Sequence, residues 1–322
     1  TRPNNEEIKY YYPTNDLVTA PEIMFFWVAR MIIAGYEYMG DIPFKNVYYT
    51  GIVRDKLGRK MSKSLGNSPD PIELINKYGA DGVRVGILIS SPAGNDLPFD
   101  SSQCEQGRNF TNKIWNAFRL VDSWTVNNDL PQPASSKMAI DWFNAKLNKE
   151  LQNINELFDR FKISEALMAT YKLVWDDFCS WYLEMIKPGY QHPIDKQTLE
   201  TTLDFFEKLL KVLQPFTPFV AEELWHLIRE RKEGEDIIIA QWPTVCSSNE
   251  TILSDFTIAE EVITNIRNIR KKNNIATKIK MELFVRKNKE INTDFDCVIV
   301  KMGNLSHLDY TTDKIENSNS FI

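Results

Sequence analysis

The chain has 322 residues, enough for two or three domains with their own cores. Hydrophobic residues make up 43% and charged residues 25%, which excludes a disordered or collagen-like chain. A net charge of -6 excludes a uniformly basic nucleic-acid coat, so any RNA contact must come from local patches. The four cysteines stand singly, which supports neither a zinc site nor a disulfide framework and favours a reducing cytoplasm.

The longest apolar run, residues 23–33, is too short to span a bilayer and contains Arg30, so we expect no membrane partner. The N-terminus lacks the basic and apolar segments of a signal peptide, and it lacks an initiator methionine. We therefore expect a cytoplasmic chain that is a piece of a longer protein.

Residues 8–104 have the pattern of a mixed α/β region. A helix is predicted from Pro21 to about Ala34, with Gly35 as its stop. The β-branched and aromatic run 47–53 predicts a buried strand, and two helices are predicted over residues 71–77 and 80–90.

Residues 105–245 have helical spacing interrupted by proline-containing or other helix-breaking linkers, which predicts an antiparallel bundle. The helices are expected at 106–124, 138–159, 164–187, 195–213 and 218–232. Aromatic side chains on their apolar stripes are expected to be mostly core: Trp115, Phe118, Trp142, Phe158, Trp175, Trp181 and Trp225.

The remaining residues form a third, smaller unit, with a helix over 253–272, a strand over 280–286, a helix near 291–302 and a polar tail. The predicted fold class is thus α/β followed by mainly α and then a small α+β unit. The predicted domains are residues 1–104, 105–245 and 246–322.

One basic loop stands out in this acidic chain. Residues 54–63 carry five basic side chains against one acid, Asp55. Gly58 allows a tight turn, while Lys60 and Lys63 point the same way if a helical turn begins there. An anonymous basic run is more often a solvated surface loop, but two ammonium groups beside backbone N–H donors suit a polyphosphate. The chain has no P-loop pattern.

Several motifs in order along the chain carry a family resemblance. Lys60-Met61-Ser62-Lys63-Ser64 resembles the second signature of the class I aminoacyl-tRNA synthetases. Residues 12–19, followed by Glu22 to Met31, resemble the valine-specific members of this family. Residues 79–84 and 95–100 fit the segments near the signature, while residues 108–117 and 215–225 resemble the first and last helices of an anticodon-binding bundle.

The resemblance implies the second half of a nucleotide-binding, Rossmann-like domain followed by the anticodon-binding bundle. It implies ATP, with Mg²⁺, as a substrate and assigns phosphate stabilisation to Lys60 and Lys63. The ATP site would comprise Thr50, Gly51, Ile52, Lys60, Met61, Ser62, Lys63 and Ser64. For Ser62 and Ser64, helix capping is an equal alternative.

The same resemblance places Ile23 and Trp27 against the valine side chain; without it, such a pair is most often core. The first class I signature, the editing insertion and a C-terminal coiled-coil arm have no counterpart in this sequence. We therefore expect the chain alone not to form aminoacyl-adenylate. No bound metal is expected.

Two basic surfaces are candidates for tRNA contact. Residues 264–280 carry six basic side chains and no acid, which suits phosphate contact or a solvated helix face. On the predicted helix 106–124, basic and polar residues recur at spacings compatible with one exposed face, which suits contact with the anticodon stem-loop. The candidates are Arg108, Lys113, Asn116, Arg119, Arg267, Arg270 and Lys271.

The preferred hypothesis is a valine-specific tRNA ligase that acts with ATP, L-valine and tRNA(Val) and is a monomer. An isoleucyl or leucyl enzyme is the alternative within the class, and the segment Phe25 to Met31 favours valine. A stand-alone tRNA-binding module is a further alternative, but it would have no use for an ATP loop.

Overall fold

The computed structural model describes residues 5–91, 94–286, 292–313, 315–316 and 318–321, apart from the side chain of Lys63. The chain divides into two compact units. Unit 1 comprises Thr1–Thr111 and Asn153–Ala169, and unit 2 comprises Asn112–Gln152 and Thr170–Ile322. The domain boundaries predicted after residues 104 and 245 stay predictions. No helix in the described part of the chain is long and apolar enough to cross a membrane.

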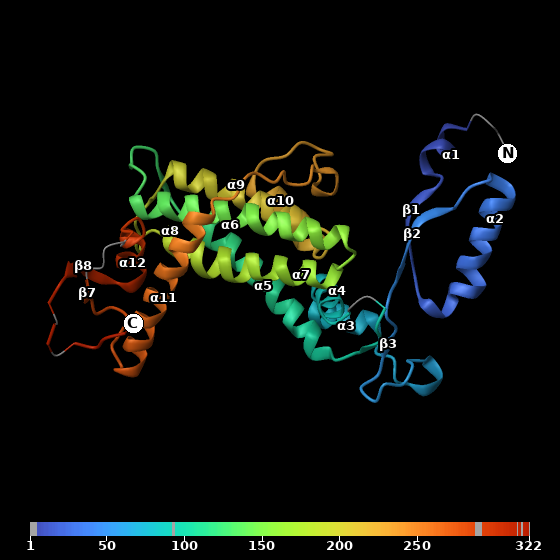
Figure 1. The fold of residues 1–322 in the computed structure, drawn as a ribbon, viewed down its shortest axis with the longest axis horizontal. Coiled ribbons are helices and arrows are strands. Elements are labelled where there is room, and N and C mark those ends of the chain that lie inside the picture. Colours follow the sequence, from blue (N-terminus) through green and yellow to red (C-terminus); the bar gives the residue numbers. More distant parts are fainter. Residues whose placement is uncertain (1–4, 92–93, 287–291, 314, 317, 322) are drawn as a thin grey trace. The chain divides into compact units, whose positions relative to one another are not determined.

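Unit 1 contains short parallel strand pairs and helices (Figure 1). Its elements are α1 (Glu6–Tyr11), β1 (Thr14–Thr19), the 3-10 turn η1 (Pro21–Ile23), the π-helical η2 (Met24–Val28), α2 (Ala29–Met39), β2 (Phe44–Tyr49), β3 (Val53–Arg54), the 3-10 turn η3 (Lys63–Leu65), α3 (Pro71–Tyr78), α4 (Ala80–Ile89) and β4 (Leu97–Pro98). Strand β1 pairs in parallel with β2, and β3 with β4. Parallel pairs require crossovers, and helices supply them here, as predicted for an α/β region.

The helical segment predicted from Pro21 to Ala34 begins at Pro21, as predicted, but differs in helix type and in its end. It begins as η1 and η2, and α2 continues through Gly35 to Met39. Gly35 is buried within α2, and a Cβ there would lie 2.8 Å from the Tyr12 hydroxyl and 2.9 Å from Pro43 Cδ, so a larger residue does not fit. The predicted stop at Gly35 is therefore wrong. Gly40, with φ 73°, ends the helix in the left-handed conformation.

The strand predicted over residues 47–53 is two strands. β2 ends at Tyr49 and β3 begins at Val53, so residues 50–52 lie between them. The helices α3 and α4 confirm the predictions for 71–77 and 80–90 to within one residue.

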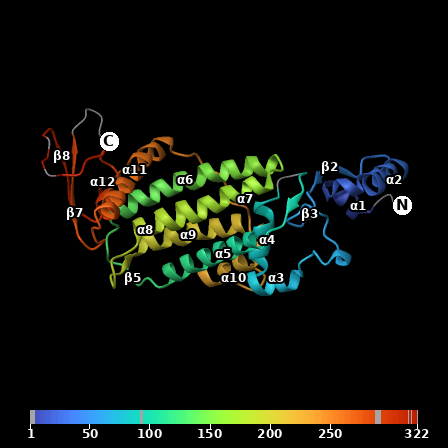
Figure 2. The same ribbon diagram turned by 90° about the horizontal axis from the view of Figure 1, so that it is seen from below.

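Three long helices have residues in both units: α5 (Ser101–Asp122), α6 (Ala134–Asp159) and α7 (Ile163–Lys172). Unit 2 adds β5 (Val126–Asn127), the π-helical η4 (Leu173–Tyr182), α8 (Leu183–Ile186), β6 (Ile194–Asp195), α9 (Lys196–Leu213), α10 (Pro218–Ile228), the 3-10 turn η5 (Ile237–Ile239), α11 (Glu250–Lys272), β7 (Met281–Arg286), α12 (Asp296–Gly303) and β8 (Leu305–Thr311). The helix predicted over 164–187 is α7, η4 and α8 in succession. In Figures 1 and 2, α10 lies beside α9, and α12 lies beside α11 at the C-terminal end of unit 2.

Aromatic rings fill the core of unit 2. The Phe143 ring stacks on Tyr182 at 4.9 Å and meets Phe205 edge-on at 5.1 Å. The buried Tyr182 hydroxyl has a partner in Thr202 Oγ1 at 2.8 Å, so this phenol is paired within the core. Of the aromatic residues predicted to be core, Phe118, Trp142 and Trp225 are buried, and the other four are half-buried.

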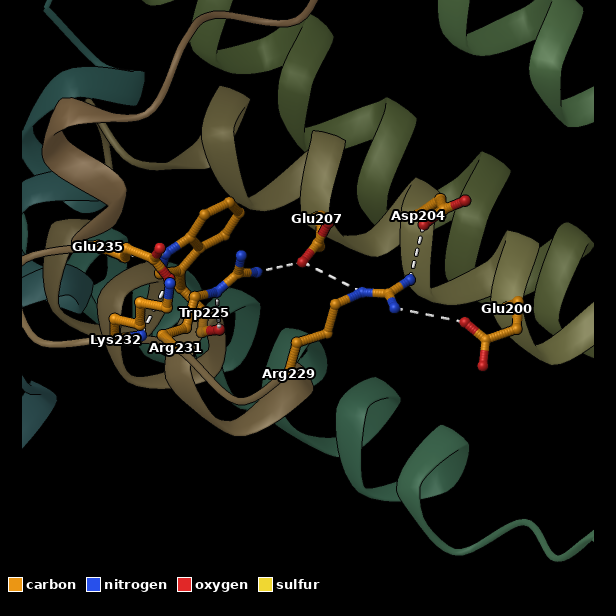
Figure 3. Close-up of polar contacts among 8 residues, drawn as sticks. All are labelled: Glu200, Asp204, Glu207, Trp225, Arg229, Arg231, Lys232 and Glu235. Carbon is orange, nitrogen blue, oxygen red and sulfur yellow. Dashed lines mark hydrogen bonds and ion pairs between the residues drawn. The ribbon is translucent and has the colours of Figure 1, made fainter.

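Helix α10 ends at Ile228, four residues before the predicted end, because two arginines turn toward α9 instead (Figure 3). Arg229 pairs with Asp204 at 2.7 Å and with Glu200 and Glu207. The Arg231 guanidinium lies 3.5 Å from the centroid of the Trp225 ring and also pairs with Glu207. These contacts fix the segment after α10 against α9.

The last part of unit 2 repeats the parallel arrangement, with α12 between β7 and β8. Strand β7 agrees with the strand predicted over 280–286. The helix predicted near 291–302 is observed as Asp296–Gly303, and residue 291 lies outside the described residues. Strand β8 occupies a stretch for which the sequence pattern predicted no element.

We expect Arg231→Met to lower the free energy of unfolding by about 2–4 kcal/mol, because it leaves Glu207 half-paired and uncovers Trp225. The matched change Arg229→Met is expected to cost about 1 kcal/mol, since the Arg229 side chain is 34% exposed against 15% for Arg231. Urea unfolding measures both values. Equal losses would contradict the greater role given to Arg231.

A second polar cluster lies beside a cavity of about 300 Å³ lined by Trp142, Lys146, Asp177, Phe256 and Glu260, among others. Burial raises the pKa of Asp177 to about 7, with Glu150, Asp176 and Glu260 adding to the rise. Lys146 Nζ opposes it from 3.7 Å while also pairing with Glu150. This carboxyl therefore titrates near neutral pH.

The free energy of unfolding should fall as the pH rises from about 4 to about 7. The folded carboxyl of Asp177 titrates near 7 and the unfolded one near 3.8, so the folded chain holds the extra proton between these values. Asp177→Asn should remove on the order of 2 kcal/mol of this dependence. Urea unfolding at several pH values checks it, with Asp129→Asn, at an exposed aspartate that does not act on Asp177, as the control. An unchanged pH dependence in Asp177→Asn would contradict the assignment.

Candidate functional site

The basic loop predicted to bind phosphates begins as a tight hairpin after β3. Asp55 N–H donates to the Arg59 carbonyl at 2.9 Å, and Gly58 N–H donates back to the Asp55 carbonyl at 2.9 Å. Gly58 has φ 77°, which suits the turn. Arg54 and Lys60 form an antiparallel bridge across it. The hairpin thereby sets the direction in which the signature segment leaves.

Asp55, the one acid of the basic run, holds this hairpin together. Its carboxylate accepts the Leu57 N–H at 3.0 Å and both the N–H and Nε–H of Arg59 at 2.8 Å. Asn67 Nδ2 donates to it at 3.0 Å. These bonds, that of Asn67 above all, lower the pKa of Asp55 to about 2, so it is a carboxylate at every physiological pH.

Asn67 joins the two ends of the loop and also reaches its middle. Besides donating to Asp55, its Nδ2 donates to the Lys60 carbonyl at 3.3 Å, and its Oδ1 accepts the Ser62 N–H at 2.9 Å. Sequence reasoning assigned no side-chain role to Asp55 or Asn67. The available signals were a lone acid four residues before Arg59 and an asparagine directly after Gly66.

The two signature lysines differ in what the structure describes. Lys60 Nζ lies 2.8 Å from Glu22 Oε2, with side chains 62% and 46% exposed. Such an exposed pair contributes little to stability, so the ammonium is free to exchange partners. Lys63 begins the turn η3, but its side chain lies outside the described residues, so the common orientation of Lys60 and Lys63 stays a prediction.

Ser62 supports the capping alternative. Its Oγ accepts the Leu65 N–H at 3.2 Å and lies 3.0 Å from Ser64 Oγ. The exposed Ser64 hydroxyl thus bonds to its neighbour within the turn, and Met61 is half-buried beside them. A role for either hydroxyl on ATP stays a prediction.

The predicted adenosine segment, residues 50–52, is held by close backbone contacts. Thr50 N–H donates to the Thr19 carbonyl at 2.8 Å, and Ile52 N–H donates to Asp96 Oδ1 at 3.2 Å. A Cβ on Gly51 would lie 1.6 Å from the Asn95 carbonyl oxygen, so only glycine fits there. Asp96 pairs with Arg54, and this bond lowers the pKa of the Asp96 carboxyl.

Ile23 and Trp27, predicted to line the valine pocket, are 41% and 60% exposed. Ile23 ends the 3-10 turn η1, and Trp27 lies in the π-helical η2. Residues four apart share a face of an α-helix, but neither of these residues lies in one. Their contact with valine stays a prediction.

The candidates for tRNA contact on α5 differ in exposure. Arg108 is half-buried, pairs with Glu105 at 3.3 Å and lies 5.7 Å from the Tyr78 ring. Lys113 Nζ lies 5.4 Å from the ring of Trp175, which stacks on Tyr171. Asn116 and Arg119 are exposed.

On α11, Arg267 and Lys271 are exposed, and the Arg267 guanidinium lies 5.1 Å from the Trp181 ring. Arg270 is different, because it is only 7% exposed. Its NH1 donates to the carbonyls of Ala276 and Ile279, and its NH2 to those of Gly303 and Asn304. The expected phosphate contact of Arg270 is thus replaced by a structural role that joins the end of α11 to α12.

Within the described residues, one group of three side chains brings possible metal ligands together. His226 Nε2 lies 3.0 Å from Glu222 Oε1 and 3.5 Å from Asp236 Oδ1. These groups already pair with one another, and Glu222 also accepts the Ile237 N–H at 3.1 Å. Their mutual hydrogen bonding explains the cluster without a metal.

Two parts of the chain match models of families that act on tRNA. Residues 1–100 match the family model for tRNA synthetases class I (I, L, M and V). Residues 141–285 match the model for the anticodon-binding domain of tRNA ligase.

The relatives in sequence include bacterial valine–tRNA ligases. The protein of Phocaeicola vulgatus is 60% identical over 322 residues, and that of Christiangramia forsetii is 57% identical over 319 residues. Each alignment covers 99% of this chain but 36% of the relative. The chain therefore spans about a third of the length of these curated relatives.

Solved structures support the fold at much lower identity. A LeuRS of Agrobacterium radiobacter, solved in a ternary complex with tRNA and LeuAMS, has a TM-score of 0.53 at 18% identity. It covers 87% of this chain and 31% of its own. The methionyl-tRNA synthetase of Mycobacterium tuberculosis, in complex with methionyl-adenylate, has a TM-score of 0.53 at 19% identity, covering 73% and 49%.

Arg270→Met should unfold the end of unit 2, with a loss of about 2–4 kcal/mol, because four carbonyls, that of the buried Gly303 among them, lose their donor. Arg267→Met on the same helix should cost less than about 1 kcal/mol, since its guanidinium is exposed. Urea unfolding and amide exchange in residues 276–286 measure the difference. A stable Arg270→Met chain with impaired RNA binding would restore the original expectation.

Proposed function

The chain belongs to the class I tRNA synthetase family, and we propose that it supplies the ATP loop and the anticodon-binding part of a valine–tRNA ligase. In this proposal ATP and L-valine form valyl-adenylate, and the valyl group passes to tRNA(Val). The observation that carries it is the loop over residues 54–67, in which the Lys60 ammonium stays exposed while the backbone beneath it is held by Asp55 and Asn67. The identity of 57–60% to valine–tRNA ligases supports valine as the amino acid.

The chemistry requires positive charge at the phosphates. A valine carboxylate oxygen attacks the α-phosphorus, the bond to the β-phosphate oxygen breaks, and pyrophosphate leaves with the added charge. Lys60 and Lys63 stabilise that charge as it develops, while Mg²⁺ accompanies ATP as part of the substrate. Thr50, Gly51 and Ile52 line the adenosine side, and Ile23 with Trp27 contacts the valine methyl groups.

The tRNA contacts come from basic and polar side chains of α5 and α11. Arg267 and Lys271 on α11 contact phosphates, and Lys113, Asn116 and Arg119 on α5 are the candidates for the anticodon stem-loop. Arg108 completes the set on α5. The stacking of Lys113 on Trp175 and of Arg267 on Trp181 keeps both cations extended over apolar rings, which supports contact with unpaired bases as well as with phosphates.

The finer architecture in this proposal is the second half of a Rossmann-like domain, an antiparallel anticodon-binding bundle and a small α+β unit. The ligase acts as a monomer in the cytoplasm. In this proposal the chain alone does not form valyl-adenylate, since it spans about a third of the length of the valine–tRNA ligases that it matches.

The first test is tRNA binding by this chain at two salt concentrations. We expect tRNA(Val) to bind more tightly than tRNA(Ile), and the preference to persist at the higher salt. Arg267→Ala and Lys271→Ala should each reduce the slope of log K against log [salt] by about 1, because each removes one phosphate contact. Lys208→Ala on α9 is the matched control.

Equal binding of both tRNAs that vanishes with salt would show that this chain contributes charge and no anticodon specificity. Valine-dependent pyrophosphate exchange tests the enzymatic part. It should be absent for this chain alone and present in an enzyme of the relatives' length that contains it. Exchange supported by isoleucine or leucine in place of valine would overturn the assigned amino acid.

A further inference from the structure

We propose that Asn67, which lies outside the five-residue signature, is the positioning residue of the ATP loop. It acts with Asp55 as a clasp that fixes the backbone under Lys60 and Ser62. This inference rests on the proposed function, because it concerns how the loop presents its lysine to phosphates.

The contacts of Asn67 account for the shape of the loop. Residues 55 and 67 are joined directly, Nδ2 to Oδ2 at 3.0 Å, so the clasp closes a loop that contains the whole signature. From the same amide, the Lys60 carbonyl receives a bond at 3.3 Å and the Ser62 N–H finds an acceptor at 2.9 Å. One side chain thus fixes the main chain on both sides of Met61.

The chemistry of the amide is specific to this task. Asn67 must donate to a carboxylate and a carbonyl while accepting from an N–H, which a carboxylate or an apolar side chain of similar size cannot do. Asp55 cannot hold the loop alone, because its other three bonds all stay within the hairpin at Leu57 and Arg59. The low pKa of Asp55 keeps the acceptor charged throughout the physiological range.

The clasp holds the backbone of the loop but does not bind the Lys60 ammonium. The Lys60 ammonium takes no part in it and lies on the exposed Glu22 instead. The backbone is therefore placed in advance while the ammonium remains exchangeable. Positioning of this kind lowers the barrier without adding a contact to the substrate.

Amide hydrogen exchange of this chain tests the clasp directly. In Asn67→Ala, exchange of the peptide over residues 56–66 should be at least about tenfold faster, because three hydrogen bonds are lost and one alone is worth up to about that factor. Asn67→Asp keeps the shape but brings a carboxylate against Asp55, and it should lose at least as much protection. Asn46→Ala, which breaks an exposed 2.9 Å amide–carboxylate bond to Asp16 in the same unit, is the matched control.

Peptides from α3 and α4 report whether the variants remain folded. Wild-type protection in Asn67→Asp would overturn the proposal, since shape alone would then suffice. So would unchanged exchange in Asn67→Ala.

Kinetics in an enzyme of the relatives' length test the consequence. Asn67→Ala should lower kcat of pyrophosphate exchange about tenfold and leave KM for valine within twofold, as expected when a transition-state interaction is weakened. An unchanged kcat beside a loosened loop would overturn the positioning role. If the wild type showed no valine-dependent exchange, the proposed function would fail, and amide exchange would still decide whether Asn67 holds the loop.

Discussion

The bond between Asn67 and the buried carboxylate of Asp55 is the constraint on which the candidate site depends. Without it the hairpin at Gly58 and the turn at η3 would be two pieces of exposed chain that move independently. With it, the loop closes over a span of 12 residues. One charge-assisted hydrogen bond helps to offset the conformational entropy that is lost when the loop closes. The basic run can therefore be both exposed and ordered.

Elsewhere in the chain, too, a charged side chain of one element holds a neighbouring segment in place. Arg270 joins the end of α11 to the loop after it and to the end of α12 by donating to four carbonyls. Arg229 and Arg231 end α10 early because α9 presents acids to them (Figure 3). In each case the guanidinium is bound to groups of the protein itself, so it is not available to a ligand.

The sequence predicted those elements whose signals are local. Helices α3, α4 and α9 begin beside a proline, glycine or aspartate and carry periodic apolar residues, and the structure agrees with the predicted bounds within about a residue. The errors arise where a distant contact decides the outcome. Gly35 has the chemistry of a helix stop, but the approach of Tyr12 and Pro43 makes it a packing position within α2. No local pattern contains that information.

The candidate site follows the same division. Motif and charge located the loop, because lysines, serines and a glycine in that order are visible in the sequence. They could not distinguish Arg270 from Arg267. The two arginines lie three positions apart on the same helix, and the sequence reads the same whether a guanidinium faces water or donates to carbonyls. The number of cations on residues 264–280 therefore overstates the charge that RNA can neutralise. A salt dependence of binding counts only exposed cations, and this is why the distinction between buried and exposed arginines on α11 is a statement about function as well as about folding.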